Sequence, residues 1–194
     1  MLKKIIWSIK NYQVARMARH IIPALDLPGN LLDVGCSTGL LSRELQRKTS
    51  MEVVGIDVVC PSDAGFPVLI YDGEVIPFPE NSFRNVLLCY VLHHSDDPVR
   101  LLKEAQRVCS HRLIVVEDIA ETSAQHRIAM AKDRFYNMLM VPDMPMTYNF
   151  KSTKEWVEIF GELGLRLTDS YQTPSMPVNP VKQTLFVLDK ASNY

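Results

Sequence analysis

The sequence predicts an α/β protein with one mostly parallel sheet and helices on both of its faces. Two observations lead to this expectation. From Asn30 onward, short runs of β-branched and aliphatic residues alternate with amphipathic stretches at helical spacing, and short connections join them. The chain of 194 residues is long enough to bury one substantial core, and no internal repeat or low-complexity tract divides it. We therefore expect a single domain spanning residues 1–194.

The first part of this alternation supplies four strands and two helices. The expected strands are 31–34, 51–57, 67–72 and 85–91. A helix over 40–48 carries Leu41 and Leu45 on one face. A second helix begins at Asp97 and Pro98 and runs to Cys109, because a proline in the first turn of a helix loses no hydrogen bond.

The last part of the chain ends the sheet with a change of strand direction. A fifth strand is expected over 113–117, and a methionine-rich helix over 120–140. Ser152 and Glu155 form a capping box for a helix that reaches Leu163. Two final strands, 165–171 and 184–188, have no helix between them, so we expect them to pair antiparallel.

Composition narrows the classes of function. The net charge of −1 gives no general attraction to nucleic acid, so no nucleic-acid partner is expected. The four cysteines stand far apart, without a CxxC pair or a histidine at zinc spacing. We therefore expect reduced thiols in a cytoplasmic protein, and no metal site. The cysteines are Cys36, Cys60, Cys89 and Cys109.

The N-terminal segment 1–28 is basic and amphipathic. It has no acidic residue before Asp26, and apolar residues recur in it near helical spacing. Its basic residues up to Leu25, histidine aside, are Lys3, Lys4, Lys10, Arg16 and Arg19. Three interpretations are open: a helix that covers the sheet beside the active site, a helix that rests on an anionic membrane surface, and an organelle transit peptide. The first of these is favoured.

Acidic residues end three consecutive strands, at the edge where open α/β sheets bind ligands. The first strand leads into 33–39, Asp-Val-Gly-Cys-Ser-Thr-Gly, whose glycines permit a tight turn before a helix. Asp57 ends the second strand, 24 residues after Asp33, where a carboxylate accepts hydrogen bonds from both ribose hydroxyls. Asp72 and Gly73 end the third, well placed for an adenine amine. Together these residues predict an adenosine site.

These motifs resemble those of the class I S-adenosylmethionine-dependent methyltransferases, in the small-molecule (type 11) subgroup that contains quinone-ring methylases. The similar segments are the first glycine motif, the ribose motif, the proline-rich adenine loop, the histidine segment with its helix, and a late Phe-x-(Ser/Thr)-x-x-x-Trp segment: 31–39, 55–57, 72–83, 91–108 and 150–165. The resemblance covers almost the whole chain after Asn30. It implies a Rossmann-like domain, a seven-stranded sheet with an antiparallel last strand, S-adenosylmethionine as cofactor, and a small-molecule acceptor.

Carried onto this sequence, the resemblance and the strand ends assign a set of cofactor-binding residues. They are Asp33, Gly35, Cys36, Ser37, Gly39, Asp57, Val58, Asp72, Gly73, Cys89 and Tyr90. Two positions depart from the family pattern. Ser37 replaces the middle glycine of the first motif, which narrows the space for the methionine end of the cofactor. The segment 109–112 replaces a Pro-Gly-Gly turn, so we expect a shortened loop far from the cofactor.

For catalysis we expect His94 or His93 to act as a general base, because histidine titrates near neutral pH. Asp118 is expected to orient this base or the acceptor. Each histidine has an alternative, structural role: it could hold its loop by hydrogen bonds or cap the next helix. Asp118 could likewise be an ordinary acidic residue at the end of a strand. Only one of the two neighbouring histidines is expected to face the pocket. Oxygen, carbon and nitrogen acceptors are all compatible with these residues.

The segment 119–150 is expected to form a lid over the acceptor, and simple helix packing is its alternative role. Methionine and aromatic side chains would give this pocket a pliable lining that favours a partly apolar or aromatic molecule. The lining expected from the sequence is Met130, Phe135, Tyr136, Met138, Leu139, Met140, Val141, Met144, Met146 and Tyr148.

Three other functions compete with methyl transfer. A nicotinamide dehydrogenase is disfavoured by Ser37 and Leu40, which stand where its fingerprint has small residues, and by the lack of a Tyr-x-x-x-Lys pair. A serine hydrolase would use the Gly-x-Ser-x-Gly pattern of 35–39, but no glycine-rich oxyanion loop precedes it. A cofactor-binding domain without catalysis is the remaining alternative. No Asp-Pro-Pro-Tyr or Asn-Pro-Pro-Tyr motif indicates a DNA-base methylase.

Overall fold

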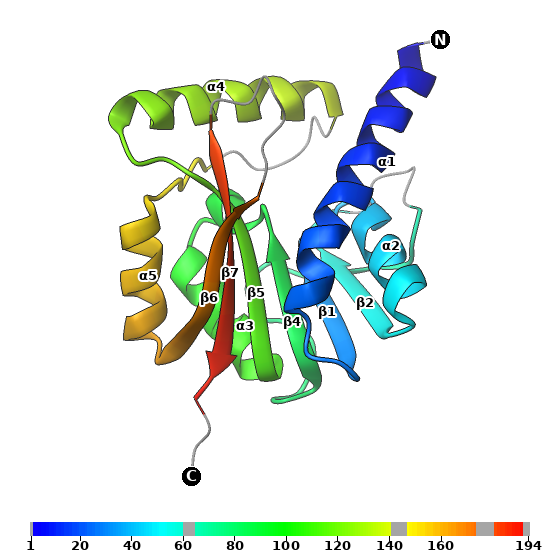
Figure 1. Ribbon diagram of the computed structural model, residues 1–194, viewed down its shortest axis with the longest axis vertical. Coiled ribbons are helices and arrows are strands. Elements are labelled where there is room, and N and C mark those ends of the chain that lie inside the picture. The colour runs from blue at the N-terminus through cyan, green and yellow to red at the C-terminus, as the bar shows by residue number, and fades with distance from the viewer. Residues whose placement is uncertain (1, 60–64, 141–146, 174–180, 192–194) are drawn as a thin grey trace.

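A computed structural model describes residues 2–59, 65–140, 147–173 and 181–191, and within these the side chains of 2–10 and 136–140 are not described. A seven-stranded sheet runs through the molecule in the order β3-β2-β1-β4-β5-β7-β6 (Figure 1). The strands are β1 Asn30–Val34, β2 Glu52–Asp57, β3 Val68–Ile70, β4 Phe83–Cys89, β5 Cys109–Ile119, β6 Leu165–Thr173 and β7 Lys182–Lys190. The α-helices are α1 Leu2–Ile21, α2 Leu40–Thr49, α3 Pro98–Val108, α4 Ser123–Met140 and α5 Thr153–Glu162, and short 3-10 turns cover Ile22–Ala24 and Leu92–His94.

The direction of the strands confirms the predicted fold class. The pairs β1–β2, β2–β3, β1–β4 and β4–β5 are parallel, whereas β7 is antiparallel to both β5 and β6. The chain leaves β1 toward β2 and β3, then returns to the other side of β1 with β4. This reversal places a crevice at the carboxyl ends of β1 and β4, where α/β proteins bind ligands.

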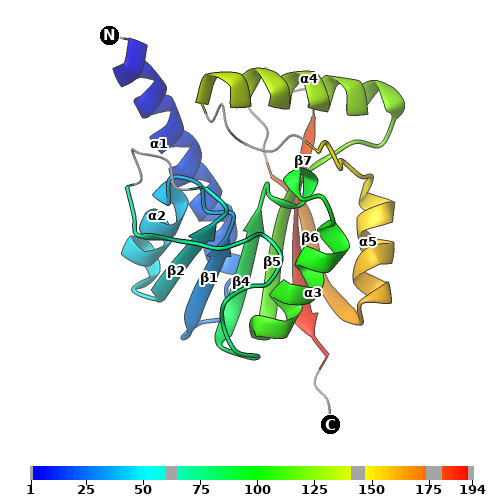
Figure 2. The same ribbon diagram turned by 180° about the vertical axis from the view of Figure 1, so that it is seen from behind.

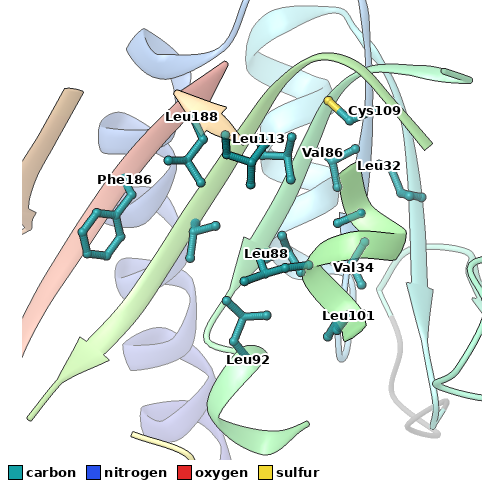
Figure 3. Packing of buried hydrophobic residues seen from close by; sticks show 14 of the residues in the cluster. Leu32, Val34, Val86, Leu88, Leu92, Leu101, Cys109, Leu113, Phe186 and Leu188 are labelled. Atoms are coloured by element: carbon teal, nitrogen blue, oxygen red, sulfur yellow. The ribbon is translucent and has the colours of Figure 1, made fainter. Parts of the chain in front are cut away.

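Two apolar layers flank the sheet, because alternate residues of each strand point to opposite faces. On one face Leu32, Val34, Val86 and Leu88 pack with residues of α3, α5 and β7, as Figure 3 shows for part of this cluster. On the other face Leu31 and other strand residues pack with α1 and α2. The helices therefore cover both faces of the sheet (Figures 1 and 2).

Helix α1 covers the sheet with its last turns. Met17, Ala18 and Ile21 are buried beside Leu31 and Leu45. This packing agrees with the interpretation of the N-terminal segment as a cover. The first turns of α1 reach past the strand ends in Figure 1. Among the described residues, no helix is both long and apolar enough to cross a bilayer.

Several element boundaries differ from those predicted. Strand β3 ends at Ile70, so Asp72 lies in the following loop and not at the strand end. Strand β4 ends at Cys89, because Tyr90 takes a left-handed backbone conformation with φ 57°. Strand β5 begins at Cys109, directly after α3, since Cys109 pairs with Phe83 of β4, and β7 joins on the other side from Arg112 onward. The shortened connection expected at 109–112 is therefore confirmed.

Candidate active site

The loop after β1 turns sharply beside β2. Gly35 and Gly39 have φ values of 72° and 67°, a region that residues with a side chain rarely adopt. The N–H groups of Gly35 and Cys36 both donate to the Ile56 carbonyl, at 2.8 and 3.1 Å. A Cβ on Gly35 would lie 2.4 Å from Cγ2 of Val91, so this loop touches the loop after β4. The two loops therefore meet at the switch point of the sheet.

Ser37 lies at the tip of this loop, also with a positive φ of 50°. Its backbone N–H donates to Oδ2 of Asp57 at 2.7 Å. Oδ1 of Asp57 accepts a hydrogen bond from the Val59 N–H at 3.2 Å. Asp57 thus stands at the end of β2, as expected, and fixes the first loop. A carboxylate has four lone-pair sites, so both oxygens retain capacity for further donors.

Apolar side chains are exposed at the ends of β2 and β3 and in the loop that follows β3. Val58 directly follows Asp57, Ile70 ends β3, and Val75 lies in the loop beyond Asp72; about half of each side chain is accessible to solvent. Asp72 is exposed, and its Oδ1 accepts from the N–H groups of Glu74 and Val75. These backbone contacts lower the pKa of Asp72. The region therefore offers apolar surface for a flat ring and a carboxylate for a polar edge.

Asp33 and Cys36 are buried beneath the loop. Asp33 accepts a 2.6 Å hydrogen bond from the Ser42 hydroxyl. Burial raises the pKa of Asp33 to about 6, the Ser42 contact lowers it, and the charge of Asp57 raises it further. The Cys36 sulfur lies against Gly55, where an added Cβ would approach it to 2.8 Å. Cys36 therefore packs the loop on β2.

Tyr90 directly follows β4 at the same crevice, next to Cys89. Its N–H bonds the Val116 carbonyl at 2.8 Å, but its hydroxyl is buried without a hydrogen-bond partner among the described residues. Burial raises the pKa of Tyr90, and the Cys89 side chain raises it further. Buried hydroxyls normally have partners. An unsatisfied hydroxyl and a left-handed backbone at one residue indicate a place built for a ligand.

These residues fit the cofactor that the sequence implies. S-adenosylmethionine needs acceptors for ribose hydroxyls, apolar surface for adenine, and polar groups for the methionine end. Asp57 would supply the first, and the exposed side chains of Val58, Ile70 and Val75 would supply the second. The buried hydroxyl of Tyr90 is available for the third. Gly73, with φ 81°, keeps the third loop close to Val58.

His93 lies three residues after Tyr90 and is held by the buried carboxylate of Glu117. Nδ1 of His93 lies 2.5 Å from Oε2 of Glu117, and Oε1 of Glu117 accepts from the Leu92 N–H at 2.8 Å. Burial lowers the pKa of His93, but the negative charge and hydrogen bond of Glu117 outweigh burial, so the pKa is raised overall. The Phe150 ring stacks on His93 at 4.6 Å between centroids.

His94 and Asp133 complete a group around His93. Nε2 of His94 lies 3.6 Å from Oδ1 of Asp133, and Nε2 of His93 lies 3.9 Å from the same oxygen. Asp133 belongs to α4, which crosses the carboxyl ends of the strands in Figures 1 and 2. We call His93, His94 and Asp133 the histidine cluster. Both histidines therefore direct a ring nitrogen to α4, whereas only one was expected to face a pocket.

Asp118 does not have the contact with histidine that the sequence suggested. Its carboxylate pairs with the Lys132 ammonium and accepts from Nε2 of Gln183 at 3.1 Å. Glu117 orients His93 in its place. The reason is strand alternation: β5 continues to Ile119, so neighbouring Glu117 and Asp118 point to opposite faces.

The described part of 119–150 agrees only partly with the expected lid. Met130 and Tyr148 pack on a small cluster with Ala129 and Phe150, and the Tyr148 ring stacks on that of Phe150 at 6.4 Å. Phe135, however, is 63% exposed and lines no interior surface. The other expected lining side chains lie outside the described residues: Tyr136, Met138, Leu139, Met140, Val141, Met144 and Met146.

Sequence reasoning missed Glu117 and Asp133 as parts of the site. Glu117 directly follows a run of buried aliphatic residues, 113–116, and a glutamate that is wholly buried there requires a partner. That signal was available. No sequence signal marks Asp133, because only the docking of α4 brings it to the histidines. The hydrolase alternative gains no support, since among the described residues no histidine hydrogen-bonds the Ser37 hydroxyl.

Comparison with known proteins agrees with these assignments. Residues 32–115 match the family profile described as a methyltransferase domain. An uncharacterized protein of Methanocaldococcus jannaschii is 24% identical over 83% of this chain and 74% of its own length. The ubiquinone/menaquinone biosynthesis C-methyltransferase of Laribacter hongkongensis is 27% identical over 81% of this chain, which spans only 64% of that protein.

The fold is shared with solved structures of the same kind. A SAM-dependent methyltransferase from Aquifex aeolicus superposes with a TM-score of 0.63 and 16% identity, over 90% of this chain and 89% of that one. The matching family profile, the sheet order and the residues at the strand ends agree with one another. Residues 32–115 are thus similar to a methyltransferase domain, the chain shares its fold with S-adenosylmethionine-dependent methyltransferases, and these likenesses support S-adenosylmethionine as its cofactor.

Proposed function

We propose that this protein transfers the methyl group of S-adenosylmethionine to a small, partly apolar or aromatic acceptor that binds between the loop after β1 and helix α4. The observation that carries the proposal is the contact between Gly35 and Val91. This contact joins the cofactor loop to the segment that carries His93 two residues later. Donor and acceptor would then meet at the switch point of the sheet.

Each part of the cofactor has a proposed partner. Asp57 accepts hydrogen bonds from the ribose hydroxyls, while Val58 and Gly73 border the adenine and Asp72 accepts from its amine. Gly35, Ser37 and Gly39 shape the loop around the methionine end, and Tyr90 places its hydroxyl there. Asp33, Cys36 and Cys89 support this surface from below, since all three are largely enclosed by the protein.

Among the described residues, aromatic rings line the proposed acceptor side of the site. Phe150 lies between the rings of His93 and Tyr148, and His126 meets it edge-on at 5.8 Å. Aromatic rings stabilise flat ligands by stacking and by removing apolar surface from water. This lining supports an aromatic or partly apolar acceptor over a strongly charged one. The methionine-rich remainder of 119–150 is proposed to complete the pocket.

Methyl transfer from a sulfonium is an in-line substitution, so the protein mainly aligns the reactants and excludes water. When the nucleophile is a hydroxyl or an acidic carbon, its proton must also be removed. We propose the histidine cluster as the place where the acceptor is activated. Glu117 positions His93, and Asp118 acts through its ion pair with Lys132, by holding α4 over the acceptor.

The test separates a methyltransferase from a domain that only binds the cofactor. Isothermal titration calorimetry with S-adenosylhomocysteine measures the cofactor site alone. Incubation with methyl-labelled S-adenosylmethionine and a panel of phenols, quinols, amines and nucleosides, read by mass spectrometry, measures transfer. Labelled product together with tight S-adenosylhomocysteine binding supports the proposal. Tight S-adenosylhomocysteine binding without methyl transfer to any member of the panel would favour the non-catalytic alternative.

A further inference from the structure

The atoms of the histidine cluster converge without hydrogen-bonding one another. The distances from Oδ1 of Asp133 to Nε2 of His94 and of His93 are 3.6 and 3.9 Å. A nitrogen–oxygen hydrogen bond is ordinarily shorter than about 3.2 Å. One ligand atom from each of the three residues lies within 4.8 Å of the others. The side chains are at most 10% exposed. The cluster is therefore a buried group of one carboxylate and two imidazoles.

Glu117 decides which nitrogen of His93 carries the proton. Both carboxylate oxygens of Glu117 accept hydrogen bonds, one from the Leu92 N–H and the other from Nδ1 of His93. A neutral His93 therefore has its proton on Nδ1 and its lone pair on Nε2. That lone pair points at the Asp133 carboxylate. A cation placed between this lone pair and the carboxylate would be bound by both groups.

We infer that His93, His94 and Asp133 bind a divalent first-row transition-metal cation, with zinc as the best match. Bonds of about 2.0–2.2 Å in a tetrahedral zinc site place ligand atoms roughly 3.4 Å apart. The two separations that involve Asp133, 3.6 and 3.9 Å, exceed this value by a few tenths of an ångström, and all three ligand atoms lie within 4.8 Å of one another. Two imidazoles also disfavour Mg²⁺ and Ca²⁺, which prefer oxygen ligands.

The surroundings resemble those of metal-binding histidines in general. A ligand histidine commonly donates its other ring N–H to a carboxylate, which fixes the ring and strengthens it as a ligand. Glu117 has this relation to His93, with its side chain fully buried. Phe150 stacks on the ring and restricts access of water. Sequence analysis predicted no metal site, because these three residues are brought together only in the folded chain, from the loop after β4 and from α4.

Three protein ligands leave one position of a tetrahedral cation for another molecule. On the function proposed above, an acceptor hydroxyl would take this position. The cation would lower the pKa of the hydroxyl, as it does for bound water, and the proton would pass to solvent. The acceptor oxygen then forms the bond to the methyl carbon, while the carbon–sulfur bond breaks and its electron pair stays on sulfur. The sulfonium becomes the neutral thioether of S-adenosylhomocysteine.

The experiment measures the metal directly. The full chain is stripped with a chelator, dialysed against Zn²⁺ or Co²⁺ without cofactor, and analysed by elemental analysis and visible absorption. We expect about one equivalent of Zn²⁺ and the strong visible bands of four-coordinate Co²⁺. Asp133→Asn and His94→Ala should abolish both signals. Glu117→Gln should weaken the affinity for Zn²⁺ by about 10–100-fold without abolishing binding.

Matched controls keep the result specific. His111→Ala removes a histidine at the other end of the sheet, where it pairs with Asp26, and Asp169→Asn removes an exposed carboxylate of β6. Both should bind Zn²⁺ like the wild type. Circular dichroism checks the fold of each variant, and Asp133→Asn keeps the assay decisive if Glu117→Gln does not fold.

The outcomes separate this inference from the proposed function. No Zn²⁺ or Co²⁺ bound by the wild type, or equal binding by folded Asp133→Asn, overturns the metal site. Normal binding of S-adenosylhomocysteine in that case leaves methyl transfer standing. Zn²⁺ binding without any S-adenosylhomocysteine binding would uphold the metal site and reject the proposed reaction.

Discussion

The backbone N–H of Ser37 donates to Oδ2 of Asp57 at 2.7 Å, which ties the loop after β1 to the end of β2. Asp57 thus has two tasks on the proposed function: it shapes the loop and accepts from the ribose. The Val59 N–H, at 3.2 Å, holds its other oxygen. Removing the carboxylate therefore disturbs both the shape of the cofactor site and its charge.

Asp57→Ala should weaken S-adenosylhomocysteine binding by about 10²-fold or more, because hydrogen bonds to a charged group contribute roughly 1.5–3 kcal/mol each. Calorimetry measures the affinity, and circular dichroism confirms the fold. Asp169→Asn, which removes an exposed carboxylate of β6 away from the cofactor site, is the control. Unchanged affinity in folded Asp57→Ala would contradict the ribose role.

Ser37→Gly should stabilise the protein slightly. Ser37 has φ 50°, and a left-handed conformation costs a residue with a side chain roughly 1–2 kcal/mol. Part of this gain is offset by the greater freedom of glycine in the unfolded chain, so an increase of up to about 1 kcal/mol is expected. Urea unfolding measures it. Ser170→Gly, in the exposed part of β6, should destabilise instead.

Asp33 should give stability a pH dependence between about pH 4 and 6. Burial raises its pKa from 3.8 to about 6, so the folded state binds this proton more tightly than the unfolded state does. The contribution to stability is present below the unfolded pKa and is lost as pH rises through the folded pKa. Asp33→Asn should remove the dependence and be more stable at pH 7 by about 3 kcal/mol.

Urea unfolding of wild type and Asp33→Asn across this pH range measures the effect. Asp169→Asn, an exposed change of the same charge, is the control. Parallel curves for the wild type and Asp33→Asn would show that Asp33 titrates alike in the folded and unfolded states.

His93 and His94 are proposed to activate the acceptor. His94→Ala and His93→Gln should each lower turnover by about 10²–10⁴-fold while S-adenosylhomocysteine affinity changes little, because they act on the acceptor and not on the cofactor. His111→Ala should have normal turnover. The comparison uses an acceptor found in the panel described above. Near-native turnover in both variants would leave catalysis to alignment and exclusion of water.

Helix α1 is also proposed to contact anionic membrane weakly. Its last turns are buried, whereas its first turns, which hold Lys3, Lys4 and Lys10 in the sequence, extend past the strand ends (Figure 1). The protein should sediment with phosphatidylserine vesicles at low salt and be released at high salt. Deletion of 1–10 should abolish sedimentation. A wild type that stays in the supernatant at low salt would restrict α1 to its role as a cover.

Local patterns predicted the fold well. The capping box of Ser152 and Glu155 is present, the last two strands pair antiparallel, and Asp57 ends β2. Each of these depends on neighbouring residues or on the period of side chains along a strand. The site was harder to predict, because its contacts join residues far apart in the sequence. Glu117 reaches His93 from the next strand, and Asp133 reaches it from a helix whose position depends on packing.

The direct junction of α3 and β5 has a consequence for how this sequence tolerates change. Val108 ends the helix and Cys109 begins the strand, so no spare residue separates them. An inserted residue there would shift β5 by one position against β4 and β7 and exchange its two faces. Glu117 would then point away from His93, and Asp118 away from Lys132. The number of residues between α3 and β5 is therefore as restricted as the identity of Glu117 and Asp118, whose directions depend on it.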